Sequence, residues 1–166
     1  MKRTALLAIT AGLTFAAMQL RAQEPVMGVS DPEALFHSSD PKLDTNLQAA
    51  YHIVKDLIES AHWEMADRYL TARYIQHNPN AKSGRAGVVY YFTQVVKAKP
   101  KPIPAKMHTK IVSVLAQGDL VVVAYPREHQ DPKNSAKSYT TTWFDMWRFV
   151  DGKADEHWDP ATLPAK

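Results

Sequence analysis

The fold is decided by the stretch Trp143-Phe144-Asp145-Met146-Trp147-Arg148-Phe149-Val150, which is followed after Asp151-Gly152 by Lys153-Ala154-Asp155-Glu156-His157-Trp158-Asp159. Alternating polar and apolar residues on both sides of an Asp-Gly pair are typical of two antiparallel strands joined by a tight turn. The alternation places Trp143, Asp145, Trp147 and Phe149 on one face of the first strand, and Phe144, Met146, Arg148 and Val150 on the other. An acid among three large aromatic residues makes the first face the candidate wall of a pocket.

The register of this hairpin determines which polar residues accompany Asp145. An odd-length loop would place His157 and Asp159 on the same face as Asp145, whereas a two-residue loop would pair Asp145 with Trp158. On the concave face of a sheet Asp145 would be desolvated, as a general base requires. The alternative is a strand-edge acid paired with Lys or Arg. The spacing leaves both registers and both roles open.

The residues before this hairpin extend the sheet. Period-two patterns predict strands over 110–116, 120–125 and 139–150, besides 153–158, with a tight turn at Gln117-Gly118-Asp119. The connection over 127–137 carries Pro132, Asn134 and Ser135, so we expect an exposed loop there. The second half of the chain is therefore predicted to form a meandering antiparallel sheet.

Helices are expected in the first half of the chain. Helical spacing predicts one helix capped by Asp44 or Thr45, one over 61–70 that includes Trp63, and one capped by Ser83. A short strand over 74–77 separates the last two helices and ends at a turn, and the proline-rich segment 97–104 predicts a connecting loop. Helices followed by an antiparallel sheet indicate an α+β fold.

The first residues have the pattern of a secretory signal peptide. A cationic start at Lys2 and Arg3 precedes an apolar run and the small residue Ala22. We therefore expect residues 1–22 to be a signal peptide cleaved after Ala22, 23–43 to be an irregular lead-in and 44–166 to be one domain. The protein would be periplasmic or secreted, with no membrane span after signal removal. An uncleaved membrane anchor is the alternative.

The net charge agrees with this interpretation. The chain has 20 Lys and Arg residues against 17 Asp and Glu residues, a formal net charge of +3. Lys2, Arg3 and Arg21 lie in the expected signal peptide, and subtracting them leaves 17 cations against 17 acids. A neutral mature chain gives no reason to expect a nucleic-acid partner.

The motifs exclude several classes of protein. The absence of Cys excludes a disulfide framework, a thiol nucleophile and cysteine-ligated zinc. The sequence also has no Gly-rich phosphate loop, no G-x-S-x-G elbow and no H-E-x-x-H helix. The seven His residues lie mostly on separate predicted elements, and their spacing does not indicate a metal site. We therefore expect no metal and no cofactor.

Two blocks resemble the signature of a known family. They are Tyr74-Ile75-Gln76-His77-Asn78-Pro79 and Asp145-Met146-Trp147-Arg148 with Glu156-His157-Trp158-Asp159. Both are similar to blocks of the SnoaL-like family, polyketide cyclase-like proteins of the nuclear transport factor 2-like (NTF2-like) superfamily. The resemblance implies a cone-shaped fold, in which a curved antiparallel sheet wraps around three N-terminal helices and encloses an apolar pocket. It also implies a homodimer through the convex sheet face, where Phe144, Met146 and Val150 would supply apolar area.

The resemblance implies a site as well. Members with known chemistry close polyketide rings by intramolecular aldol condensation, without metal or cofactor. Carried over to this chain, Asp145 and Asp159 are the candidate acid and base, with His77, Asn78 and His157 as donors in the pocket wall. The expected catalytic residues are Asp145, Asp159, His77 and His157, and the expected pocket residues are Tyr74, Asn78, Trp143, Trp147, Phe149 and Trp63.

These residues favour one function among three. We expect an exported, cofactor-independent enzyme that abstracts a proton from a small hydrophobic carbonyl compound, for aldol, isomerase or dehydratase chemistry. The alternative is a non-catalytic periplasmic binding protein for a small hydrophobic ligand. An epoxide hydrolase is third, because its Asp-Arg-Asp relay would need Arg148 on the face of Asp145, and the alternation places it on the opposite face. Export and the Lys-Pro-rich segment 97–106 depart from the known cyclases.

Overall fold

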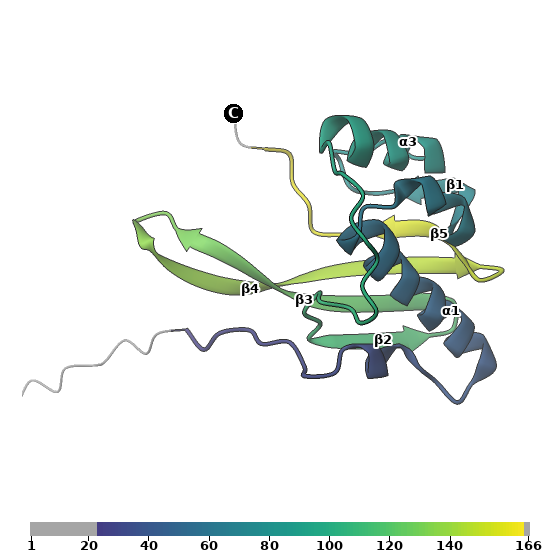
Figure 1. Cartoon of the computed structure of the whole chain (residues 1–166), viewed down its shortest axis with the longest axis horizontal. Helices are drawn as coiled ribbons and strands as arrows, with labels where there is room; N and C mark the ends of the chain where they lie inside the picture. The colour runs from purple at the N-terminus through teal and green to yellow at the C-terminus, as the bar shows by residue number, and fades with distance from the viewer. Residues whose placement is uncertain (1–22, 165–166) are drawn as a thin grey trace, which may run out of the picture.

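A five-stranded sheet forms the frame of the molecule, in the order β1-β5-β4-β3-β2 (Figure 1). The computed structural model describes residues 23–164, so the expected signal peptide lies outside the described residues. The strands are β1 (Leu70–Gln76), β2 (Ser113–Gln117), β3 (Leu120–Asp131), β4 (Asn134–Val150) and β5 (Lys153–Trp158). Neighbouring strands are antiparallel, except that β1 runs parallel to β5. The sheet is curved and open, and the predicted α+β class is confirmed.

The helices lie over one face of this sheet (Figure 1). They are η1 (Glu33–Phe36), α1 (Pro41–His52), η2 (Ile53–Glu59), η3 (Trp63–Met65), α2 (Ala66–Tyr69), α3 (Arg85–Tyr90) and η4 (Tyr91–Val95). η2 continues α1, and η4 continues α3, in wider π-helical turns. Within 23–164, no helix is both long and apolar enough to cross a lipid bilayer.

The core lies between the first helical rod and the middle of the sheet. Ala50, Val54 and Leu57 are fully buried on α1 and η2, because helical spacing aligns them on one face. They pack in one apolar cluster with Val121 and Trp147 of the sheet. Large apolar side chains of this kind each contribute about 1.5–3 kcal/mol on burial, and they hold α1 and η2 against the concave face.

The helix boundaries differ from the sequence expectation for local reasons. Asp40 caps α1 instead of Asp44 or Thr45, since Pro41 fits the first helical position and the Asp40 carboxylate accepts from the amides of Lys42 and Leu43. The helix expected over 61–70 ends at Tyr69, where β1 begins. Ser83 does not cap α3; its hydroxyl accepts from the amide of Gln76, and Gly84 precedes the helix with a φ of +88°.

The expectation of a loop over 127–137 is wrong. β3 and β4 continue past the other strands as a two-stranded arm that projects from the body (Figure 1), and they remain paired from Pro126↔Thr142 to Gln130↔Ser138. The arm is largely solvent-exposed and polar on both faces, so the alternation that predicts a strand is missing there. The N-terminal segment contacts the arm. The Gln23 side-chain amide donates to the Thr140 carbonyl at 2.7 Å and accepts from the Thr140 backbone N–H at 3.1 Å.

A bulge in β5 sets the register of the last hairpin. Val150 and Lys153 pair across the two-residue turn Asp151-Gly152, where both residues have positive φ. The next pairs are Phe149↔Ala154 and then Arg148↔Glu156, so Asp155 is an extra residue on β5.

This extra residue has the effect of an odd-length loop. It pairs Trp147 with His157 and brings His157 and Asp159 to the face of Asp145. The bulged side chain is itself anchored, since the buried Asp155 carboxylate accepts hydrogen bonds from the Thr71 hydroxyl at 2.7 Å and from the Arg73 guanidinium.

Candidate functional site

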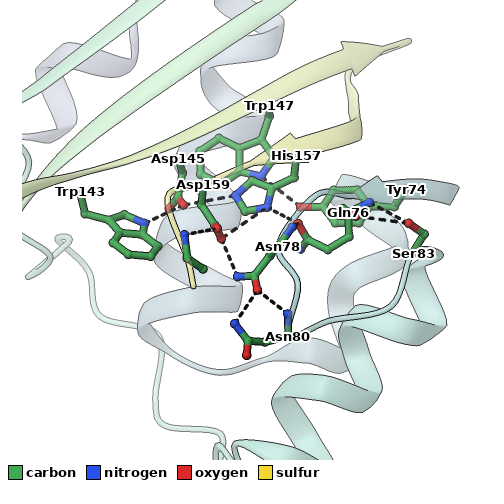
Figure 2. A network of polar contacts seen from close by, with 11 residues as sticks. Tyr74, Gln76, Asn78, Asn80, Ser83, Trp143, Asp145, Trp147, His157 and Asp159 are labelled. Carbon is green, nitrogen blue, oxygen red and sulfur yellow. Dashed lines mark hydrogen bonds and ion pairs between the residues drawn. The ribbon is translucent and has the colours of Figure 1, made fainter. Parts of the chain in front are cut away.

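A cavity of about 860 Å³ opens between the helices and the concave face of the sheet. Apolar walls come from Leu57 of η2, Val88 of α3, and Trp63, whose ring stacks on Phe92 with centroids 3.9 Å apart. The polar side chains of the sheet wall lie in two places. One group lies where β4, β5 and the end of β1 meet (Figure 2), and another lies on β3 and β4 toward the arm and includes Arg127, His129 and Thr141. A deep pocket with a few convergent polar groups is the typical form of a small-molecule site.

Asp145 and His157 form a buried hydrogen-bonded pair at the centre of this polar group. The Nε2 atom of His157 lies 3.2 Å from Oδ1 of Asp145, and both residues are less than a tenth exposed. The indole N–H of Trp143 donates to the same Oδ1 at 3.0 Å. No described residue forms a hydrogen bond to Oδ2 of Asp145. One carboxylate oxygen is therefore held by two partners, and the other is left for a ligand in the cavity.

Gln76 fixes the tautomer of His157. The Oε1 atom of Gln76 accepts from the backbone N–H of Asn78 at 3.1 Å, which identifies it as the carbonyl oxygen. The same atom lies 2.8 Å from Nδ1 of His157, so Nδ1 must carry a proton and donate it. The face of the ring is also held, since the Trp147 indole stacks on it with centroids 5.3 Å apart. Nε2 is therefore the atom of His157 that exchanges a proton with Asp145.

Asp159 is the third charged group of the cluster. Its Oδ2 accepts from the Asn78 amide at 2.7 Å and lies 4.0 Å from Nδ1 of His157. Its Oδ1 accepts from the backbone N–H of Ala161 at 2.9 Å. Asn80 in turn donates to the Asn78 carbonyl oxygen at 3.0 Å, which orients the Asn78 amide (Figure 2). Both oxygens of Asp159 are occupied by donors, so this acid supplies negative charge to His157 and is less free than Asp145 to accept a proton.

Two tyrosine hydroxyls lie near these acids. The Tyr74 oxygen accepts from the Trp147 indole at 3.2 Å and its own proton has no acceptor among the described residues. The Tyr125 hydroxyl is buried without a hydrogen-bond partner in residues 23–164. Burial, and then the charge and the nearby carboxylate of Asp145, raise the pKa of Tyr125 well above the ordinary value. Burial also raises the pKa of Tyr74, so both phenols stay protonated near neutral pH. Of the two, only Tyr74 is part of the cavity lining and is available as a donor to a ligand.

The cluster also has the composition of a possible metal centre. Asp145, His157 and Asp159 each offer one ligand atom, and these atoms lie within 4.8 Å of one another. Two carboxylates and an imidazole suit a divalent cation. In the geometry described here, however, Nε2 of His157 faces Asp145 and Nδ1 faces Gln76. A cation would have to replace the hydrogen bond between Asp145 and His157, so the arrangement fits acid–base chemistry more directly.

The structure brings most of the expected site residues to one cavity. The lining includes Asp145, His157, Asp159, Tyr74, Asn78, Trp143, Trp147 and Trp63. Two expected residues lie elsewhere. His77 bonds to Glu156 at 2.8 Å, stacks on Trp158 and is not part of the lining, and Phe149 is buried in the apolar core.

Sequence reasoning missed Gln76 and Arg127, which line the cavity, and the buried Tyr125 near Asp145. Gln76 is next to His77 in the first signature block, and its side chain reaches His157 because β1 pairs Gln76 with His157. Tyr125 and Arg127 share the face of Val123 by simple alternation along β3, which could have placed them beside Trp143. Arg148 lies on the opposite face, as expected, bonded to Asp119 and Glu156.

Comparison with known proteins identifies the family. The family model of the SnoaL-like domain matches residues 52–157, which is more than half of the chain. The chain belongs to the SnoaL-like family. No curated protein sequence matches this SnoaL-like chain significantly.

Solved structures confirm the NTF2-like fold expected from the resemblance. An NTF2-like protein of unknown function from Burkholderia pseudomallei has a TM-score of 0.51 at 17% identity, and the match covers 71% of this chain and 91% of that one. A candidate polyketide cyclase from Acidithiobacillus ferrooxidans has a TM-score of 0.52 at 17% identity, with coverage of 74% and 89%. A candidate polyketide cyclase from Bacillus cereus has a TM-score of 0.50 at 19% identity, with coverage of 82% and 84%. At these identities the likeness shows the fold alone.

Proposed function

We propose that this SnoaL-like protein is a cofactor-independent enzyme that removes a proton from the carbon next to a carbonyl group of a small hydrophobic compound. The observation that carries the proposal is the buried pair of Asp145 and His157, with Oδ2 of Asp145 left for a ligand in a cavity whose helical wall is apolar. A base in such a site needs little solvent reorganisation to act. Family membership supports chemistry of the cyclase or isomerase type.

The hydrogen bonds of Asp145 and His157 show how many protons the two side chains share. Because Nδ1 of His157 donates to Gln76, a single proton is left between Nε2 and Oδ1 of Asp145. In the ion-pair form of this contact, Asp145 is a carboxylate and His157 is a donor, which is the form that can accept a substrate proton. Asp159 lies 4.0 Å from Nδ1 and its negative charge favours that form.

Proton abstraction converts the ketone into an enolate, and residues of the cavity can accept the proton and stabilise the oxygen. Oδ2 of Asp145 takes the proton, the C–H electron pair becomes a C=C bond, and the carbonyl oxygen becomes an enolate oxygen. The Tyr74 hydroxyl, which accepts from Trp147 and keeps its own proton, supports a donor role toward that oxygen. The enolate carbon then attacks a second carbonyl, regains a proton elsewhere or expels a leaving group. These three outcomes are aldol, isomerase and dehydratase chemistry, and they share the first step.

The first step is testable without knowing the natural substrate. The purified protein is incubated in deuterated buffer with a panel of aryl and alicyclic ketones, and loss of the α-proton signal is followed by NMR. We expect the wild type to catalyse exchange, and Asp145→Asn to reduce the rate by about 100-fold or more. Asp159→Asn should reduce it less, since Asp159 acts through His157. Asp67→Asn, an exposed acid outside this cavity, is the matched control and should exchange like the wild type.

Two outcomes would contradict the proposal. Exchange by the wild type that Asp145→Asn leaves unchanged would remove Asp145 from the reaction. Binding of ketones with no exchange by the wild type would favour the non-catalytic binding protein instead.

We also propose that the protein is exported and processed after Ala22, on the strength of the N-terminal sequence pattern. The test is expression of the full chain in a bacterial host, fractionation of the cells and intact-mass measurement. A periplasmic or secreted product that begins at Gln23 is expected. A full-length product in the cytoplasm would contradict the proposal.

A further inference from the structure

Arg127 is the one Lys or Arg residue among the described residues that line the cavity. It lies on β3 opposite Thr141, next to the Pro126↔Thr142 pair at which the arm begins. Its guanidinium carbon lies 4.0 Å from the centroid of the Trp143 ring, a cation–π contact. Within residues 23–164 it forms no ion pair and no side-chain hydrogen bond. A cation is therefore presented to the cavity with its donors uncommitted.

The stacking on Trp143 leaves these donors well placed. A guanidinium carries all five of its N–H bonds in the plane of the group, so the contact of its face with an aromatic ring leaves the edges free. Such an edge matches a carboxylate with two parallel hydrogen bonds.

The cavity has its cation on one side of Trp143 and its acids beyond it. The two acids of the lining, Asp145 and Asp159, lie together at His157, whereas Arg127 lies over the Trp143 ring, whose indole N–H donates to Asp145. A ligand with a negative charge at one end would be drawn to Arg127 and repelled from the acids, and this fixes its direction in the cavity. An uncharged ligand would lack this orientation.

We propose that Arg127 binds the carboxylate of an amphipathic keto acid, and so places its acidic C–H group at Asp145. The proposal rests on the proposed function and specifies its substrate class. It also limits the length of the ligand. The guanidinium lies over the Trp143 ring and Asp145 accepts from the indole N–H of the same residue, so the carboxylate of the ligand and its reacting carbon must lie close together.

A pair of matched ligands tests the anion site. The acid 4-oxo-4-phenylbutanoate and its methyl ester share the aromatic ring and the ketone and differ in charge. Their affinities are measured by isothermal titration calorimetry on the wild type, Arg127→Ala, Arg127→Lys and Lys137→Ala. Lys137 is an exposed cation on the same arm outside the lining, so its variant is the control.

We expect the wild type to bind the acid about tenfold more tightly than the ester, which corresponds to 1.4 kcal/mol. Arg127→Ala should remove this preference and leave the ester affinity within about twofold, since only the charged contact is lost. Arg127→Lys should keep part of the preference, because it keeps the charge without the planar fork. Lys137→Ala should behave as the wild type. An equal affinity of the wild type for acid and ester, a preference that persists in Arg127→Ala, or the absence of binding would each overturn the proposal.

The same titration on Asp145→Asn separates this proposal from the proposed reaction. That variant keeps Arg127 and removes one negative charge from the cavity, so its preference for the acid should be retained or increased. Loss of deuterium exchange with retained preference supports both proposals. Loss of the preference in Asp145→Asn would contradict the anion site, whatever the exchange experiment gives.

Discussion

Replacement of Asp155 by Ala should destabilise the protein far more than a typical surface substitution, because Asp155 anchors the bulge of β5. Its carboxylate is only 6% exposed and accepts hydrogen bonds from Thr71 and Arg73. A hydrogen bond to a charged group contributes about 1.5–3 kcal/mol. The Arg73 side chain is 64% exposed, so its N–H groups bond to water when the carboxylate is lost, and the loss of this ion pair costs little free energy. The expected loss in free energy of unfolding is therefore about 2 kcal/mol, mostly from the buried carboxylate and its hydrogen bond with Thr71.

The measurements are urea unfolding, which gives the free energy, and thermal unfolding, both followed by circular dichroism. For a domain of this size, about 2 kcal/mol lowers the melting temperature by roughly 4–8 °C. The matched control is Asp119→Ala, which also breaks an Asp–Arg pair, but one in which Asp119 is 45% and Arg148 37% exposed. An exposed pair of this kind contributes about 0–1 kcal/mol. Equal destabilisation by the two substitutions would refute the assignment of the anchoring role to Asp155.

The pH dependence gives a second, independent check. The Arg73 hydrogen bond lowers the pKa of Asp155 from its ordinary value of 3.8 in the folded protein. The unfolded chain therefore takes up a proton at a higher pH than the folded protein does, and the stabilisation is full above the ordinary value. It declines as the pH falls through the folded pKa. The difference in stability between the wild type and Asp155→Asn should thus shrink between pH 7 and pH 3, and a constant difference would contradict the reasoning.

Three further substitutions have expected outcomes. Gly152→Ala should lower the free energy of unfolding by about 1–2 kcal/mol, measured by thermal melting, since Gly152 has a φ of +72° and an added Cβ would lie 3.1 Å from a methyl carbon of Thr45. Gln76→Leu leaves the Nδ1 proton of His157 unpaired, a loss of about 1–3 kcal/mol, and should slow the deuterium exchange roughly tenfold, whereas an unchanged rate would contradict the role given to Gln76. Phe144 is 50% exposed on the convex face of the sheet, so we expect a homodimer there, and sedimentation at micromolar concentration should show a dimer for the wild type and a monomer for Phe144→Lys.

The order and class of the elements could be predicted from the sequence because they depend on periodicity. The shift from helical spacing around Val54 to alternation around Trp147 reflects which faces are buried, and burial of those faces is what the structure shows. Boundaries were less predictable. The Asp40 carboxylate competes as a cap with the Asp44 carboxylate and the Thr45 hydroxyl. The choice depends on Pro41 and on the Ser38 backbone amide, which donates to Asp44 instead.

The site could be predicted only as far as faces could be assigned. Asp145 shares a face with Trp143 and Trp147 whatever the partner strand does, because that depends on β4 alone. Whether His157 joins them depends on one extra residue, and no local signal in Lys153-Ala154-Asp155 specifies a bulge. His77 and Gln76 are neighbours in sequence, yet only the side chain of Gln76 reaches the ring of His157, since the pairing of β1 with β5 decides which of the two side chains points inward.

The tie between Gln23 and Thr140 has a chemical consequence at the proposed cleavage site. Processing after Ala22 would make Gln23 the first residue of the chain, and an N-terminal glutamine can cyclise to pyroglutamate. The α-amino nitrogen then attacks the side-chain carbonyl, and the Nε2 atom leaves as ammonia. That atom is the one that donates to the Thr140 carbonyl at 2.7 Å. Cyclisation would therefore remove this hydrogen bond between the N-terminal segment and the arm, and older molecules would lack it.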